Sequence, residues 1–145
     1  ITEAITPMLR DVTVMVTNLL GRITEEAEFQ DRNCIKVVCD LKGDALYFSR
    51  QPIPTRSSTD EIPTGKQVCV IPFRREFLLE YIRMTPTPLE IAESVDMMRI
   101  LEHGSKVRMA PTGYLTYAVD TKEDAERVEK LLRLDPLTAT YLDEI

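Results

Sequence analysis

An aspartate near the carboxyl-terminal end of the chain, Asp120, separates an alternating apolar segment from an acidic helical pattern. The alternating residues before it, as in a strand with one buried face, are Leu115, Tyr117 and Val119. From Thr121 onward the apolar residues repeat at helical spacing, so Asp120 is expected at the carboxyl end of a strand, where open α/β sheets bind ligands. Its carboxylate can bind Mg²⁺, which prefers hard oxygen donors. Alternatively, the aspartate only shapes the turn.

Two glutamates, Glu90 and Glu93, lie three residues apart and therefore face the same side of a predicted helix. Carboxylates placed in this way can bind sugar hydroxyls. Glu90 has a second possible role, because Thr87 and Glu90 form a capping box with proline at the first helical position. The helix dipole also favours acidic residues in a first turn, so a structural explanation stands beside the binding one.

Arg50 ends an apolar strand pattern just before a proline-rich segment, residues 50–66. A guanidinium that leaves a strand end can hold a carboxylate or a phosphate with two hydrogen bonds. It can equally pair with Asp44 or Asp60 on the surface. Arg50 is therefore a candidate anion-binding residue with a plain structural alternative.

The composition favours one globular domain, because the chain has 145 residues of which 43% are apolar. A formal net charge of −6 argues against nonspecific nucleic-acid binding, and no apolar run is long enough to span a membrane. Three cysteines and one histidine fit neither a disulfide framework nor a zinc cluster. We therefore expect a cytosolic protein with buried, reduced cysteines.

The elements that must position these residues alternate between strand and helix. The patterns predict strands over residues 11–18, 35–39, 45–49, 67–73, 106–110 and 114–119, and helices over 24–29, 74–83, 88–103 and 121–134. Gly43 permits the positive φ of a hairpin turn, and Gly104 is expected to end a helix. The helical residues expected on apolar faces are Phe77, Leu78, Tyr81, Ile91, Val95, Met98, Leu101, Ala125, Val128, Leu131 and Leu132. Together the elements predict an α/β sandwich with a mixed sheet.

Three segments occur in an order that resembles the sugar-nucleotide cytidylyltransferases, most closely the 3-deoxy-manno-octulosonate (Kdo) cytidylyltransferase family. They are Ala-Leu-Tyr-Phe-Ser-Arg-Gln-Pro-Ile-Pro at 45–54, the run from Thr87 to Leu101, and the Val-Asp-Thr segment that begins at Val119. The resemblance implies a three-layer sandwich with a mixed, mostly parallel sheet of the nucleotide-diphospho-sugar transferase type. Residues 1–135 would be its sugar-binding and dimerising part, without the preceding nucleotide-binding part, and 136–145 a tail.

The resemblance further implies a reaction, partners and site residues. CMP would pass from CTP to the anomeric hydroxyl of an acidic sugar such as Kdo, in a Mg²⁺-dependent homodimer that uses the hairpin and the proline-rich loop as its interface. Asp120 would be the metal ligand and Arg50 a catalytic group. The residues expected to bind substrate are Glu90, Glu93, Gln67 and Arg74.

The chain departs from the family pattern at three positions. Gln67 and Phe73 stand where the family often has His and Tyr, and Met97 replaces a glutamine expected near the sugar. With the nucleotide-binding part missing as well, we expect this chain alone to be inactive. The alternative is a non-catalytic sugar-binding or dimerisation module derived from that family.

Overall fold

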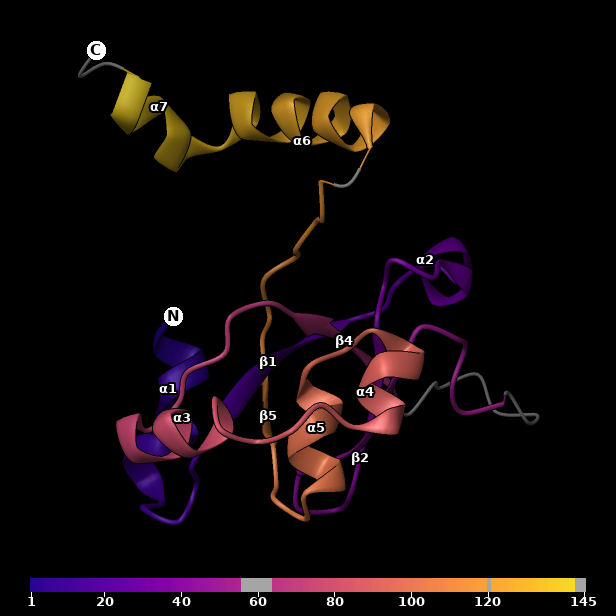
Figure 1. The fold of residues 1–145 in the computed structure, drawn as a ribbon. Helices are drawn as coiled ribbons and strands as arrows, with labels where there is room; N and C mark the ends of the chain where they lie inside the picture. The colour runs from indigo at the N-terminus through magenta and orange to yellow at the C-terminus, as the bar shows by residue number, and fades with distance from the viewer. Residues whose placement is uncertain (56–63, 120, 143–145) are drawn as a thin grey trace. The chain divides into compact units, whose positions relative to one another are not determined.

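A five-stranded sheet organises the first of two units into which the chain divides. The first unit is Ile1–Tyr114 and the second is Leu115–Ile145. The computed structural model describes residues 1–55, 64–119 and 121–142 (Figure 1). Among these residues, no helix is both long and apolar enough to cross a membrane.

The sheet is mixed, as expected for the α/β class, and its strands pair in the order β3-β2-β4-β1-β5. The strands are β1 (Thr17–Arg22), β2 (Lys36–Cys39), β3 (Ala45–Ser49), β4 (Gly65–Val68) and β5 (Arg108–Pro111). Of the four pairings between these described strands, only β1 with β5 is parallel. The prediction of a mostly parallel sheet is therefore wrong here. Parallel pairing needs a long crossover connection, whereas β2 and β3 are joined by a tight hairpin.

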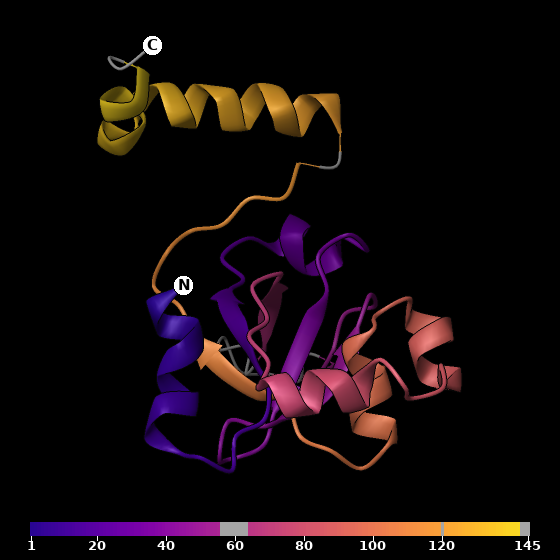
Figure 2. The same ribbon diagram turned by 60° about the vertical axis from the view of Figure 1, so that its left-hand side comes forward.

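Helices lie on both faces of this sheet (Figure 2). On one face α1 (Thr2–Arg10) packs Ala4 against Leu19 and Ala110. The opposite face holds the larger core, which includes residues of α3 (Arg75–Tyr81) and α5 (Met97–Glu102), as well as Val95 between α4 (Pro88–Glu93) and α5. A short helix, α2 (Glu26–Gln30), follows β1.

The first strand begins later than its sequence pattern predicts. Val12 is 79% exposed, although it begins the alternating valine series. Asp11 explains this, because its carboxylate accepts hydrogen bonds from the backbone N–H and the hydroxyl of Thr13, at 2.9 and 2.6 Å. The Val14 N–H also bonds back to the carbonyl of Asp11. These local bonds hold residues 11–14 in a turn, so the strand begins only at Thr17.

The two edge strands of the sheet touch each other. The hairpin turn at Gly43, which has φ +82° as predicted, brings Asp44 opposite Arg108 in an antiparallel bridge. The Ala45 N–H donates to the carbonyl of Val107, and the Met109 N–H donates to that of Gly43, both at 2.9 Å. The sheet therefore closes partly on itself at this end.

Asp44 reinforces this closure with its side chain, which is only 7% exposed. Its carboxylate accepts from Lys106 Nζ at 2.9 Å and from Arg108 Nε at 2.5 Å. These hydrogen bonds hold the pKa of Asp44 below its ordinary value, although burial acts in the opposite direction. Asp44 therefore pairs with these two cations, and among the described residues it makes no ion pair with Arg50. Asp60, the other partner suggested for Arg50, lies outside the described residues.

The single helix predicted over residues 88–103 is two helices. Ser94 adopts a left-handed conformation (φ 53°, ψ 50°) that ends α4, and α5 restarts at Met97. Because the break interrupts the helical repeat, Ile91 is 70% exposed while Val95 and Met98 are buried. Gly104, with φ +79°, follows α5 as predicted.

The second unit contains α6 (Lys122–Leu134) and α7 (Pro136–Leu142). Thr121 caps α6 and forms a capping box with Asp124. Residues 115–119 form no strand, so the strand predicted over 114–119 is wrong. None of the four α6 residues predicted to face a core is buried, and Leu131 and Leu132 are 41% and 49% exposed. The amphipathic pattern correctly predicts a helix here, but its apolar side is not buried among the described residues.

Candidate active site

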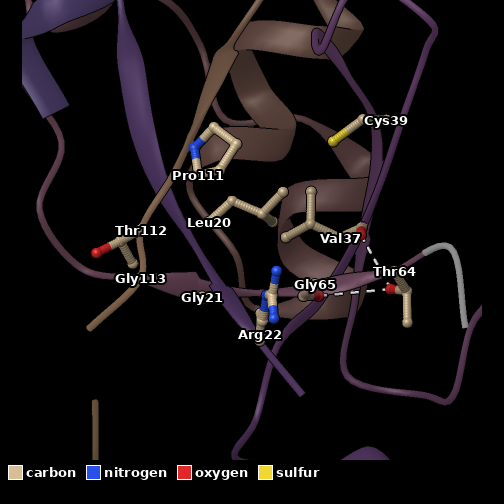
Figure 3. Close-up of a pocket in the computed structure, with 10 residues that line it drawn as sticks. All are labelled: Leu20, Gly21, Arg22, Val37, Cys39, Thr64, Gly65, Pro111, Thr112 and Gly113. Carbon is tan, nitrogen blue, oxygen red and sulfur yellow. Dashed lines mark hydrogen bonds between the residues drawn. The ribbon is translucent and has the colours of Figure 1, made fainter. Parts of the chain in front are cut away.

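A cavity of about 600 Å³ lies at the carboxyl ends of β1, β2 and β5 (Figure 3). This is the edge at which open α/β sheets bind ligands. Its polar groups come from Arg22, Thr64 and Thr112, and three glycines also line it. At Gly65 a Cβ atom would lie 2.8 Å from the backbone oxygen of Gly21 and 2.6 Å from Leu20 Cδ1, so any larger residue would require the neighbouring strand to shift.

Arg22 is the cationic group of the cavity, and it is not among the site residues predicted from the sequence. Its side chain is exposed and has no ion-pair or hydrogen-bond partner among the described residues. The two threonines are already bonded: Thr64 Oγ1 donates to the Val37 carbonyl at 2.9 Å, and Thr112 Oγ1 donates to a Glu3 carboxylate oxygen at 2.5 Å. A polar residue at the end of a strand is a sequence signal for a binding residue. The strand predicted over residues 11–18 ends four residues before Arg22, so this signal is assigned to the wrong position.

Arg50 and Glu93 are the two predicted site residues that the structure brings into direct contact. The backbone N–H of Arg50 donates to Glu93 Oε2 at 2.9 Å, and Arg50 Nε donates to the Glu93 carbonyl at 2.8 Å. The terminal nitrogens of Arg50 donate to the carbonyls of Arg32 and Ser94, at 3.0 and 3.1 Å. The guanidinium is thus oriented by three carbonyl oxygens.

A buried lysine holds the other side of this cluster. Lys36 is fully buried, and its ammonium donates to the carbonyls of Asp31, Cys34 and Arg50 at 2.6, 2.6 and 2.8 Å. Three carbonyl acceptors match the three N–H groups of an ammonium. Burial lowers the pKa of Lys36, and it also raises the pKa of Tyr47, which hydrogen-bonds to Glu93.

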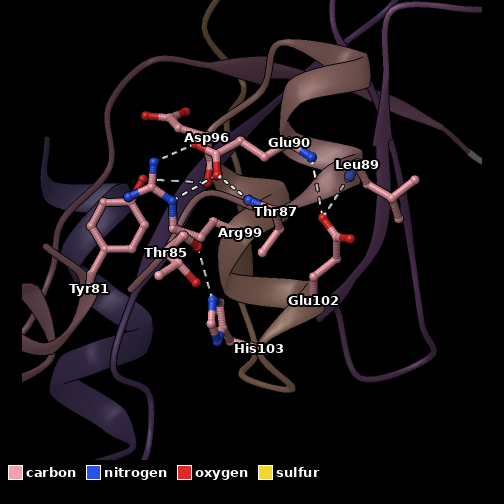
Figure 4. Close-up of polar contacts among 9 residues, drawn as sticks. All are labelled: Tyr81, Thr85, Thr87, Leu89, Glu90, Asp96, Arg99, Glu102 and His103. Carbon is pink, nitrogen blue, oxygen red and sulfur yellow. Dashed lines mark hydrogen bonds and ion pairs between the residues drawn. The ribbon is translucent and has the colours of Figure 1, made fainter. Parts of the chain in front are cut away.

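Glu90 forms a separate cluster between α4 and α5 (Figure 4). Its carboxylate accepts from Arg99 Nε and Nη2, at 2.7 and 2.5 Å, and from the backbone N–H of Thr87 at 3.2 Å. The bond to Arg99 holds the pKa of Glu90 below its ordinary value. Glu90 therefore has the predicted capping role, and its binding role stays a prediction.

The same view shows how the start of α4 is anchored. Glu102 Oε2 accepts from the backbone N–H groups of Leu89 and Glu90, at 3.0 and 3.2 Å. These are amides that the helix itself cannot satisfy. His103 Nε2 lies 3.2 Å from the carbonyl of Thr85, so the only histidine of the chain also contacts a backbone carbonyl.

The remaining predicted substrate-binding residues lie apart from these clusters. Gln67 Nε2 donates to Asn18 Oδ1 at 2.7 Å, between β4 and β1. Arg74 donates through Nε to the Val14 carbonyl at 2.9 Å and through Nη2 to the Met8 carbonyl at 2.6 Å. These contacts tie α1 and its following turn to the start of α3, and the binding roles of Gln67 and Arg74 stay predictions.

Asp120, the predicted metal ligand, lies outside the described residues. Among residues that are described, no group of three His, Cys, Asp or Glu side chains can hold a metal ion. The three cysteines are free thiols, and the expectation that they are buried is wrong: Cys34 and Cys39 are only partly buried and Cys69 is exposed. Partial burial raises the pKa of Cys34 and Cys39 to about 11.

Comparison with known proteins connects this fold to one enzyme family. Residues 2–107 match the family model described as cytidylyltransferase. The 3-deoxy-manno-octulosonate cytidylyltransferases of Geobacter metallireducens and Solibacter usitatus are each 40% identical to the chain over 92% of its length. A solved structure, described as CMP:2-keto-3-deoxy-manno-octonic acid synthetase complexed with CTP, aligns with a TM-score of 0.81 and 30% identity over 90% of this chain.

The chain belongs to the cytidylyltransferase family. Within that family it belongs with the Kdo cytidylyltransferases, also called CMP-Kdo synthetases, which confirms the resemblance found in the sequence. It covers 57% and 53% of the two relatives and 54% of the solved chain. The chain therefore spans a little over half the length of the proteins it matches.

Proposed function

We propose that this chain is part of a Mg²⁺-dependent cytidylyltransferase that transfers CMP from CTP to the anomeric hydroxyl of an acidic sugar such as Kdo, releasing pyrophosphate. The observation that carries the proposal is the alignment at a TM-score of 0.81 with a synthetase solved in complex with CTP. The names of the relatives support Kdo as the sugar.

Within that enzyme, the chain is proposed to supply the sugar-binding and dimerising part. Nucleotidyl transfer depends mainly on positioning and on electrostatic stabilisation, so oriented cations are the expected contribution of the protein. Arg50 is suited to this, because carbonyls on two segments fix its guanidinium. Asp120 is proposed as one metal ligand, and Gln67, Arg74, Glu90 and Glu93 remain the proposed residues around the substrate.

A chimera tests the proposal directly. The part of the Geobacter metallireducens relative that this chain does not match would be joined to the chain, and CMP-Kdo and pyrophosphate would be measured with CTP, Kdo and Mg²⁺. We expect product from the chimera and none from the 145-residue chain alone. Asp120→Asn in the chimera should abolish turnover.

Three results would contradict the proposal in different ways. Turnover by the 145-residue chain alone would show that the chain does not need an additional nucleotide-binding part. Product with N-acetylneuraminate but not with Kdo would show that the sugar is wrong. A folded chimera that is inactive, while the chain binds Kdo equally with and without Mg²⁺, would favour the non-catalytic binding module.

A further inference from the structure

The main chain and side chain of Arg50 are fixed at five points, all of them on other segments. Its N–H donates to Glu93 Oε2, and its carbonyl accepts from Lys36 Nζ. Its guanidinium donates to the carbonyls of Glu93, Ser94 and Arg32. Holding a flexible arginine in one orientation costs side-chain entropy, and these contacts offset that cost before any ligand arrives.

The backbone conformation at Ser94 serves this arrangement. Among the described residues, Ser94 is the only one other than glycine with positive φ. This conformation ends α4, and the carbonyl of Ser94 accepts from Arg50 Nη2. Residues held in such strained conformations cluster at functional sites, where the surrounding structure must compensate for the strain.

The hydrogen bonds leave part of the guanidinium available. An arginine side chain has five N–H donors, and three of them are bound here. One N–H on each terminal nitrogen therefore has no partner among the residues that the structure describes. Two donors on a planar cation can hold both oxygens of a carboxylate.

Glu93 itself has little capacity left to bind a ligand. Its Oε1 accepts from the hydroxyls of Tyr47 and Ser49, at 3.2 and 3.0 Å, and its Oε2 accepts from the Arg50 N–H. Its carbonyl binds Arg50 Nε. The side chain and the backbone carbonyl of Glu93 are therefore both hydrogen-bonded to β3 or to Arg50, the residue that follows β3.

We infer that Glu93 is a positioning residue, which presents the two free N–H groups of Arg50 to the carboxylate of the acidic sugar. This inference rests on the proposed function for the identity of the sugar, and it gives Glu93 an indirect role beside the substrate in place of the direct contact expected from the sequence. Glu93 acts through Arg50 and does not touch the sugar.

The test follows the Nε–H signal of Arg50 by NMR in the 145-residue chain, with the signal assigned from its loss in Arg50→Lys. Kdo should shift the signal in a saturable manner, and the neutral methyl ester of Kdo should not. Glu93→Gln keeps the side-chain size but removes the acceptor charge. It should move the Arg50 signal in the absence of ligand and weaken Kdo binding by about tenfold, because the carboxylate holds the Arg50 backbone N–H and the hydroxyls of Tyr47 and Ser49, and so fixes the segment from which the Arg50 side chain extends.

Glu102→Gln is the matched control, because it makes the same change of charge at the opposite end of α4. It should destabilise the helix pair without moving the Arg50 signal and with less than about a twofold change in Kdo affinity. If Glu93→Gln fails to fold, Tyr47→Phe removes one of the bonds to Oε1 and should give a smaller change of the same kind.

The outcomes separate this inference from the proposed function. Equal loss of Kdo affinity in the Glu93 and Glu102 variants, or an Arg50 signal that Kdo does not shift, would overturn the positioning role. A shift caused by inorganic phosphate and not by Kdo would overturn the carboxylate assignment. If the chimera makes no CMP-Kdo while Glu93-dependent Kdo binding persists, the proposed reaction fails and the positioning role stands.

Discussion

Replacing Asp44 by asparagine should weaken the closure between the two edge strands. The substitution keeps an oxygen acceptor but removes the charge that Arg108 and Lys106 contact. A hydrogen bond to a charged partner contributes about 1.5–3 kcal/mol, and the 27% exposure of Arg108 places this one toward the lower end through solvent screening. Lys106 is 68% exposed and adds little. We expect a loss of about 2 kcal/mol in the free energy of unfolding.

The assay is urea unfolding followed by far-ultraviolet circular dichroism, because the chain has no tryptophan whose fluorescence could report unfolding. The pH dependence supplies a second measurement. Because the pKa of folded Asp44 lies below its ordinary value of 3.8, the unfolded state takes up the proton first as pH falls. The stability from Asp44 is therefore present near neutral pH and is lost below pH 3.8, so wild type and variant should converge in acid.

A double-mutant cycle with Arg108→Gln isolates the pair. If Arg108 is the main partner, Asp44→Asn should cost much less in the Arg108→Gln background. Glu80→Gln, an exposed change of the same charge on α3, should leave the midpoint nearly unchanged. Full additivity of the two substitutions, or an equal difference at pH 7 and pH 3, would refute this account of the closure.

Three further substitutions test the packing of the first unit. Gly65→Ala places a methyl group 2.6 Å from Leu20 and should destabilise by about 1–3 kcal/mol; an unchanged urea midpoint would mean that the strands separate easily. Met98→Ala empties a fully buried position and should cost about 2–5 kcal/mol by the same measurement, with a smaller value showing that the core collapses to fill the space. Ser94→Gly should raise the melting temperature slightly by relieving left-handed strain, and a lowered melting temperature would show that the serine side chain matters more than its φ.

Sequence alone predicted the elements whose signals are local. The capping glutamate Glu90, the hairpin turn at Gly43 and the helix end at Gly104 each depend on a few neighbouring residues, and the structure has all three. The start of β1 was wrong because a turn at Asp11 competes with a strand-like alternation of valines. The break at Ser94 was missed because serine rarely adopts positive φ and carries no sequence signal for it.

The candidate site was predictable only in its individual residues. Arg50 and Glu93 were selected separately, one from a strand end and one from a helix face. Their contact depends on the packing of α4 against β3, which no spacing in the sequence reveals. Arg22 was missed for a related reason, since its place in the cavity depends on where β1 ends.

The outer edge of β3 has a consequence for the behaviour of the protein in concentrated solution. An open edge strand exposes N–H groups that can pair with another chain and start aggregation. Here the Phe48 N–H bonds to Met98 Sδ at 3.4 Å, and the Arg50 N–H bonds to Glu93. The helix side chains thus occupy donors that a second β-strand would need. Oxidation of Met98 would place a polar sulfoxide in the buried core, and the resulting loss of packing between α5 and β3 would expose the edge to self-association.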